Sequence, residues 1–253
     1  MKKPLIIVTV YNRAAETEMT LRSLVDTGAA ADGEIMIYDN ASTDGATDVV
    51  WDYVMTGSSL AFFGHENIGC PRALNKIIAE CRKPGQPVIK VDNDVQFLTD
   101  GWVRKLLEFS AAHPDVALVS PWYDEIIAGR YAEDRGDWIE IFPLMGHCVY
   151  HAGDFLDQTG YFDVLSPDHL YGFEDLLMCH RAVRSGYKCG ACKQVHLENI
   201  QRKNSLDVDE ATEGRQAHVG RLRKYYNARV RLTDVLRDRY KVDSHGQIIV
   251  EGE

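Results

Sequence analysis

Short apolar runs alternate with amphipathic stretches along the first 199 residues of the chain. An apolar run bounded by turn residues indicates a buried strand, and apolar residues recurring every three or four positions indicate a helix. The pattern predicts strands over Leu5–Val10, Glu34–Tyr38, Leu60–Phe63, Pro87–Val91, Val116–Ser120, Trp138–Phe142 and His147–Tyr150, with Tyr187–His196 extended. It predicts helices over Ala15–Thr27, Thr47–Met55, Pro71–Cys81, Asp100–Ala112 and Phe173–Ser185.

Strands that alternate with helices predict a layered α/β domain with a mixed, mostly parallel central sheet. Four of the predicted strands end in polar groups: Thr9–Arg13, Asp39–Gly45, Glu66–Gly69 and Asp92–Asp94. One such cluster is typical of an ordinary turn. Ligands of open α/β sheets bind outside the carboxyl ends of the strands. Four polar clusters at this edge therefore predict a binding site.

Composition and charge narrow the class of protein. The 253 residues suffice for one α/β domain and a tail. The net charge is −10, yet residues 215–241 hold nine Lys or Arg against two Asp, so this segment carries +7 and the remainder −17. The acidic body argues against a wide nucleic-acid-binding face. The basic segment is interpreted either as a contact for an anionic partner or as a solvated helix packed on the body.

The apolar runs and the cysteines indicate the cellular compartment of the protein. No run is long enough to span a bilayer, and the first residues read as a buried strand rather than a signal peptide. Six scattered cysteines in a chain of this size favour reduced thiols, so we expect a cytoplasmic protein. Cys189 and Cys192 form a lone C-x-x-C, for which a zinc or redox role is the less favoured interpretation.

Two common nucleotide-binding patterns are missing from the sequence. No G-x-G-x-x-G follows the first strand, and the chain has no G-x-x-x-x-G-K-[ST]. Dinucleotide oxidoreductase chemistry and P-loop chemistry therefore do not fit.

The four polar clusters resemble a known family. TVYNR, YDNASTDG, ENIGCPRALN and VDND are similar to the nucleotide-sugar half of inverting GT-A-fold glycosyltransferases, especially the family 2 group. Tyr171-Gly172-Phe173-Glu174-Asp175, followed by Arg181 and Gly186, resembles the W-G-x-E-D acceptor segment of galactosyl-, GalNAc- and chondroitin-type transferases. The resemblance covers residues 4–199 and implies a donor half, 1–98, and an acceptor half, 99–199. It departs at Tyr171, usually tryptophan, and leaves 200–253 as a basic, mainly helical extension.

The resemblance implies a metal-dependent donor site. Asp94 would hold Mn²⁺ or Mg²⁺ directly, Asp92 would reach it through water or bind the ribose, and His196 would be a third ligand or else an ordinary strand-end histidine. Asp39 would accept the uracil imide N–H, which favours UDP, or would only cap its turn. The other donor-binding residues implied are Thr9, Tyr11, Asn12, Arg13, Asn40, Asn67, Gly69, Arg72 and Asn93.

The acceptor side needs a general base, because inverting transfer is a single displacement that releases the hydroxyl proton. The resemblance makes Asp175 the base and Glu174 the residue that orients the acceptor; the alternative is an acid pair that only begins a helix. Trp122, Trp138 and His147 are candidate acceptor walls, with core packing the alternative for either tryptophan. The acceptor itself stays open: a glycan, a lipid-linked sugar, a protein or a hydroxylated DNA base.

Two other functions compete with this hypothesis. A nucleotidyltransferase would make nucleotide sugars on a similar sheet, but VTVYNRAAETEM lacks the glycine-rich loop that such enzymes carry after the first strand. A catalytically inactive binding module would keep the fold without the chemistry. Intact Asp92, Asp94, Asp175 and His196 argue against an inactive module.

Overall fold

The computed structural model describes residues 2–200, except 58, 124, 125, 128, 129, 145 and 167, together with residues 222 and 223. Most of the expected C-terminal extension, 200–253, therefore lies outside the described residues. Within it Leu222 is buried against Leu165, Leu177 and Phe173. Whether the extension is mainly helical stays a prediction.

The strands of the described part form a single sheet. They are β1 Leu5–Val10, β2 Glu34–Asp39, β3 Ser59–Phe63, β4 Val88–Asp92, β5 Val95–Phe97, β6 Val116–Trp122, β7 Tyr131–Asp134, β8 Trp138–Phe142, β9 Cys148–His151 and β10 Lys188–Asn199. Their order is β3-β2-β1-β4-β9-β6-β10-β8-β7, with β5 paired to β10. β3, β2, β1 and β4 are parallel, whereas β9 is antiparallel to β4 and β6, so the sheet is mixed.

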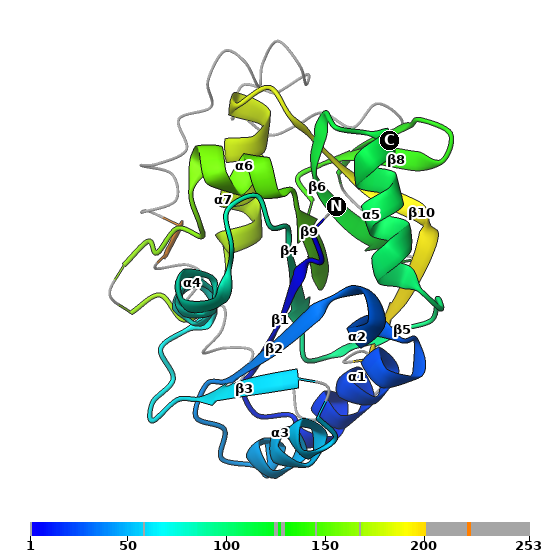
Figure 1. Cartoon of the computed structure of the whole chain (residues 1–253). Coiled ribbons are helices and arrows are strands. Elements are labelled where there is room, and N and C mark those ends of the chain that lie inside the picture. The colour runs from blue at the N-terminus through cyan, green and yellow to red at the C-terminus, as the bar shows by residue number, and fades with distance from the viewer. Residues whose placement is uncertain are drawn as a thin grey trace.

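Helices cover both faces of this sheet (Figure 1). They are α1 Ala14–Asp26, α2 Ala29–Asp32, α3 Ala46–Met55, α4 Cys70–Cys81, α5 Trp102–Ala112, α6 Gly153–Thr159 and α7 Glu174–Arg184. Figure 1 shows α1, α2, α3 and α5 on one side of the strands and α4, α6 and α7 on the other. Among the described residues, no helix is long and apolar enough to cross a membrane.

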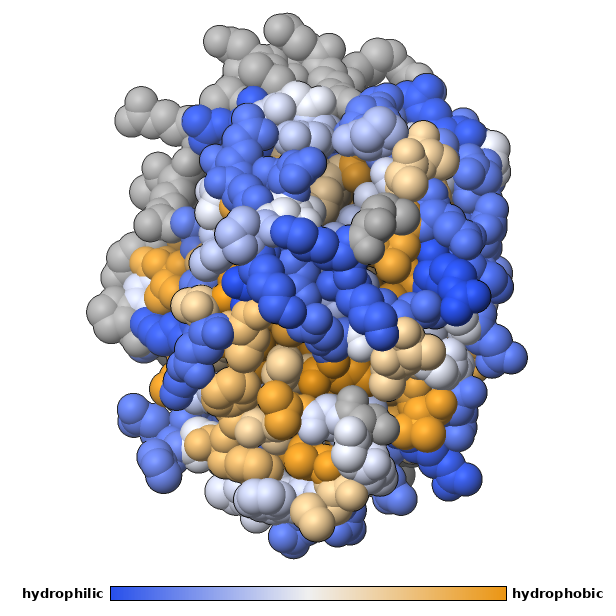
Figure 2. Space-filling view, viewed as in Figure 1, coloured by the Kyte–Doolittle hydropathy of each residue, from blue (hydrophilic) through white to orange (hydrophobic). Residues whose placement is uncertain are grey.

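The central strands are buried because helices cover them on both faces. Leu5, Ile6, Ile7 and Val8 of β1 are fully enclosed, as expected for a continuous apolar run. Figure 2 shows apolar side chains gathered in the region where β3 and α3 lie, and the exposed apolar residues of these two elements are Trp51, Met55 and Leu60. The six cysteines, all among the described residues, form no disulfide.

The predicted α/β layering and mixed sheet are confirmed, and the differences lie in short elements. α2 and α6, of four and seven residues, were not predicted because they are too short to show a helical period. β5 and β7 were not predicted because they lack the apolar run that marks the other short strands. α5 begins at Trp102, two residues after the predicted start at Asp100, and Gly101 in the left-handed conformation, rather than Thr99, is its N-cap residue. Thr99 instead accepts the backbone N–H of His196 through its hydroxyl oxygen, at 2.9 Å.

Candidate active site

Strand register brings the predicted polar clusters to one edge of the sheet. Along β1, Thr9 pairs with Asp92 of β4 and Val10 pairs with Asp39 of β2. The loop after β1 is locked between these neighbours: Asn12 accepts the backbone N–H of Thr43 at its side-chain oxygen, 2.8 Å away, and Asn93 donates to the Asn12 carbonyl oxygen at 2.9 Å. The ends of β1, β2 and β4 therefore form one continuous surface.

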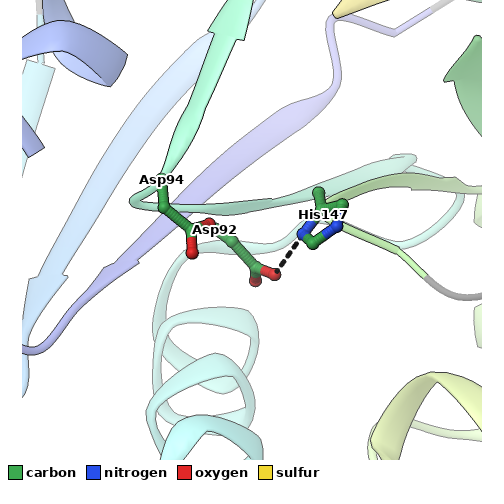
Figure 3. Close-up of side chains that lie close together, drawn as sticks. All are labelled: Asp92, Asp94 and His147. Carbon is green, nitrogen blue, oxygen red and sulfur yellow. Dashed lines mark ion pairs between the residues drawn. The ribbon is translucent and has the colours of Figure 1, made fainter. Parts of the chain in front are cut away.

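Asp92, Asp94 and His147 form a group suited to a metal ion (Figure 3). One potential ligand atom from each lies within 4.8 Å of the others. β9 is antiparallel to β4, and the Asp92 N–H donates to the His147 carbonyl oxygen at 2.8 Å, which sets the histidine beside the aspartate. Figure 3 shows the His147 ring facing Asp92. His147 Nδ1 and Asp92 Oδ2 are 3.7 Å apart.

The electrostatics of this group favour a bound cation. Burial raises the pKa of Asp94 above its ordinary value, and repulsion from the negative charge of Asp92 raises it further. Burial lowers the pKa of His147, but the Asp92 carboxylate, 3.7 Å away, and the charge of Asp94 raise it overall. Two carboxylates and one imidazole are ligands that Mn²⁺ accepts. The residues present therefore fit a divalent cation.

Arg13 gives Asp94 a positive neighbour from the protein itself. Its guanidinium donates to Asp94 Oδ2 at 2.6 Å. Asn12 and Arg13 are both left-handed, with φ of 57° and 65°, a conformation uncommon for residues other than glycine. The hydrogen bonds of Asn12 hold this strained turn, which aims Arg13 across the strand ends at Asp94.

Asp39 is buried and already bonded to its own loop. Its Oδ1 accepts the backbone N–H of Ser42 at 3.0 Å and the Ser42 hydroxyl at 2.6 Å, and its Oδ2 accepts the Thr47 hydroxyl at 2.5 Å. These bonds match the turn-cap alternative. A carboxylate oxygen can accept two hydrogen bonds, so Oδ2 keeps capacity for a nucleobase, and that role stays a prediction.

Arg72 and Gly69 connect the start of α4 to the segment that precedes α7. The Arg72 guanidinium donates to the carbonyl oxygens of Ile68, His169 and Ser166, at 3.1, 3.1 and 2.8 Å. A side chain at Gly69 would place its Cβ 2.3 Å from the His169 carbonyl oxygen. These contacts hold the segment that leads into α7 against the start of α4. Both residues therefore have a structural role.

The other predicted donor residues surround the same edge. Asn40 and Asn67 accept backbone N–H groups of the loop before α4, from Ile68 at 2.8 Å and Gly69 at 2.9 Å. Tyr11 is exposed, and the Thr9 hydroxyl lies 3.7 Å from the Cys70 sulfur. The structure thus brings these residues to one region, while their contacts with a donor stay a prediction.

Asp175 and Glu174 begin α7 and enter the site beside β4. Asp175 Oδ2 accepts the Lys90 ammonium at 3.0 Å and the Gly146 N–H at 3.3 Å. Within the described residues, Asp175 Oδ1 and Glu174 Oε2 are enclosed and have no hydrogen-bond partner. Burial raises the pKa of Asp175, an effect that the Lys90 cation opposes. Burial and the charge of Asp175 raise the pKa of Glu174 to about 7.

Two predicted site residues lie elsewhere. His196, expected as the third ligand, is exposed on β10 and is not in the metal-ligand group of the described residues, where His147 takes that place. Trp138 is 4% exposed and packs edge-to-face on Phe109 at 6.0 Å, so it belongs to the core, as the alternative for it stated. Trp122 is half-buried at the end of β6, where it pairs with His196.

Two contributions to the site were missed or misassigned from the sequence. Lys90 interrupts the apolar run of β4, and its buried ammonium contacts both Asp92 and Asp175. A charged residue within a buried strand was the available signal. His147, expected as an acceptor wall, faces Asp92 instead, and only the β4–β9 pairing shows this.

The comparisons with known proteins agree with this geometry. Residues 5–161 match the model of the family "Glycosyl transferase family 2", so the chain belongs to that family. A search of curated proteins found no match.

Several solved structures share the fold at low sequence identity. A mannosyltransferase from Pyrobaculum calidifontis, in complex with GDP-Man and Mn²⁺, is 20% identical at a TM-score of 0.59, covering 76% of this chain and 54% of that one. GalNAc-T7 with UDP, GalNAc and Mn²⁺ is 15% identical at a TM-score of 0.63, over 77% and 42%. S. aureus TarS 1-349 with UDP-GlcNAc is 16% identical at 0.53, over 76% and 56%. The chain thus spans about half the length of these proteins.

Proposed function

We propose that the protein is a metal-dependent inverting glycosyltransferase that moves a sugar from a nucleoside-diphosphate sugar, with UDP the expected nucleotide, to an acceptor hydroxyl. The observation that carries the proposal is the arrangement of Asp175. Its Oδ2 is occupied by Lys90 and Gly146, so Oδ1 is the oxygen left to accept a proton. Lys90 also links this residue to Asp92 of the metal-ligand group.

The donor would lie across the ends of β1, β2 and β4. Asp92, Asp94 and His147 would hold Mn²⁺ or Mg²⁺, which when bound neutralises charge that develops on the leaving diphosphate. Complexes of the P. calidifontis mannosyltransferase and of GalNAc-T7 contain Mn²⁺ with a nucleotide or nucleotide sugar, which supports a metal-dependent nucleotide-sugar site. Arg13 adds a positive charge at the same edge.

Transfer would be one displacement at the anomeric carbon of the sugar. The acceptor oxygen forms a bond to that carbon as the bond to the diphosphate breaks, and the nucleoside diphosphate leaves with the bonding electron pair. Asp175 Oδ1 takes the hydroxyl proton, a contribution of about 10²–10⁴-fold to the rate. Glu174, adjacent on α7, would orient the acceptor, since neighbouring helix residues point in directions about 100° apart.

A donor screen tests the proposal directly. Nucleotide release would be measured for UDP-, GDP- and CDP-sugars with Mn²⁺, with and without chelator, for the wild type and Asp175→Asn. We expect release from one donor class that requires the cation and is lost in the variant. A wild type that binds nucleotide but never releases it from any donor, with glycan, lipid-linked and nucleic-acid acceptors each supplied, would indicate a binding module instead.

A further inference from the structure

A lysine lies inside the buried strand that ends at the metal-ligand group. The Lys90 side chain is 2% exposed and stands between Ile89 and Val91 of β4. Burying an ammonium group is costly unless it is paired and fully hydrogen-bonded. Lysine has three N–H donors, and three acceptors surround them: the Gly146 carbonyl oxygen at 2.9 Å, Asp175 Oδ2 at 3.0 Å and Asp92 Oδ1 at 3.1 Å.

These three acceptors come from different parts of the fold. Asp92 ends β4 on the donor side, Asp175 begins α7 on the acceptor side, and Gly146 precedes β9. Gly146 closes the arrangement, because its N–H donates to Asp175 Oδ2 at 3.3 Å. A Cβ at position 146 would lie 1.8 Å from Val149 Cγ2, so the close approach depends on glycine.

We propose that Lys90 is a positioning residue that holds Asp92 and Asp175 in one fixed arrangement, leaving Asp92 Oδ2 for the cation and Asp175 Oδ1 for the acceptor proton. This inference rests on the proposed function. Each carboxylate gives one oxygen to Lys90, so the oxygen that remains is defined for both. The two halves of the site are thereby joined through one ammonium group.

The position of Lys90 has a consequence that a simple structural role lacks. The Lys90 ammonium and the divalent cation would both bind the Asp92 carboxylate, so the two positive charges repel each other. The ammonium also orients this carboxylate. Removing the ammonium removes this repulsion, which is substantial for charges a few ångströms apart in a buried site. A residue needed only for folding would, when replaced, weaken cation binding and turnover together.

Lys90→Met tests this, because methionine keeps the length and bulk of the stem without the charge. Mn²⁺ affinity would be measured by calorimetry without donor, alongside kcat and the KM of the donor. We expect the Mn²⁺ Kd to fall by about tenfold, while kcat falls by about 100-fold because Asp175 loses its orientation. The donor KM should change by a few-fold at most.

A matched control and a second background complete the experiment. Lys188→Met breaks a lysine–aspartate pair with Asp115, 2.7 Å apart, and changes the net charge equally at the start of β10, so both readouts should stay as in the wild type. Lys90→Met leaves Asp175 without its counter-charge, which can prevent folding. Asp175→Asn and Lys90→Met/Asp175→Asn repeat the Mn²⁺ comparison without that unpaired charge.

The outcomes separate this inference from the function on which it rests. Tighter Mn²⁺ binding with lower kcat in Lys90→Met, and tighter binding in the double variant than in Asp175→Asn, support the role of Lys90. Unchanged or weaker Mn²⁺ binding on both backgrounds, or an unchanged kcat, overturns it. A wild type that binds no Mn²⁺ and turns over no donor contradicts the proposed function instead.

Discussion

His147 Nδ1 lies 3.7 Å from Asp92 Oδ2, although 55 positions separate the two residues in the sequence. Antiparallel pairing of β9 with β4 brings them together, since the Asp92 N–H donates to the His147 carbonyl oxygen at 2.8 Å. The imidazole of the metal-ligand group therefore comes from the residue just before β9, beside Asp92 at the end of β4. β10, which carries His196, pairs with β6, β8 and β5, and the His196 side chain is exposed rather than directed at the two aspartates.

Because only His147 lies beside Asp92, replacing each histidine should affect Mn²⁺ binding differently. We expect His147→Ala to weaken Mn²⁺ binding by at least about tenfold, since loss of a group that merely orients a metal ligand already costs about 10–100-fold. His196→Ala, an exposed residue, should bind Mn²⁺ as the wild type does. Calorimetric titration of both variants and of Asp94→Ala checks this. Weakening by His196→Ala alone would restore the ligand assignment expected from the sequence.

Removal of the metal should also reveal whether transfer depends on it. We expect EDTA to abolish nucleotide release, Mn²⁺ or Mg²⁺ to restore it, and Asp94→Ala to gain nothing from added cation, because Asp94 supplies a carboxylate ligand. Release assays with a series of Mn²⁺ concentrations measure this. Undiminished release by Asp94→Ala in the presence of EDTA would contradict the metal-dependent mechanism.

Glu174 should make the stability of the protein depend on pH. Its pKa is about 7 in the folded protein against the ordinary 4.5, so folding favours the protonated form. The resulting stability is fully present below pH 4.5 and is lost as the pH rises through about 7. The difference of about 2.5 pKa units, at 1.36 kcal/mol each, gives roughly 3 kcal/mol.

Glu174→Gln removes this titration, because an amide has no proton to lose in the range. Relative to the wild type, the variant should therefore gain up to about 3 kcal/mol in free energy of unfolding between pH 5 and pH 8. Urea unfolding at both pH values measures the change, and Glu108→Gln, exposed on α5, controls for loss of a carboxylate. An equal difference at both pH values would contradict the prediction.

The relative affinities for UDP and CDP test whether Asp39 recognises the nucleobase. If its carboxylate accepts the uracil imide N–H, UDP should bind more tightly than CDP, which offers no such donor, and Asp39→Asn should lose the preference. Calorimetry with both nucleotides and Mn²⁺ measures it. Thr47→Val is the matched control: it removes the hydroxyl that donates to Oδ2 but keeps the carboxylate. We expect this control to cost about 1.5–3 kcal/mol of stability and to retain the preference; equal UDP and CDP affinities in the wild type would reject the role.

The layered α/β fold was predictable because long strands and helices leave a strong periodic pattern. β1 is a continuous apolar run and α4 begins with proline in its first turn, so both were found within one or two residues. The edge of the sheet that carries the site was also predictable, since the polar clusters follow parallel strands. β5, with three residues, left no comparable signal.

The details of the site were less accessible because they depend on pairing between distant segments. Nothing in the sequence shows whether His147 or His196 faces Asp92, and the pairing of β9 with β4 brings His147 there. Arg72 has the charge of a phosphate ligand, but three carbonyl oxygens already surround its guanidinium. Lys90 was visible as an anomaly in an apolar run, yet its partner Asp175 lies 85 positions away.

The identity of the general base is the most direct test of the chemistry. Asp175→Asn keeps the size of the side chain, and its one carbonyl oxygen can still accept from Lys90 and Gly146. The amide NH₂ then occupies the place of Oδ1, so a donor replaces the proton acceptor. We expect kcat to fall by about two to four orders of magnitude, while UDP and Mn²⁺ affinities stay within a few-fold because the metal-ligand group is unchanged. Glu174→Gln should instead raise the acceptor KM. Near-normal turnover in Asp175→Asn together with an inactive Glu174→Gln would show that the two residues have the opposite roles. Full activity in both variants would show that the acid pair only begins α7 and that the general base is another residue.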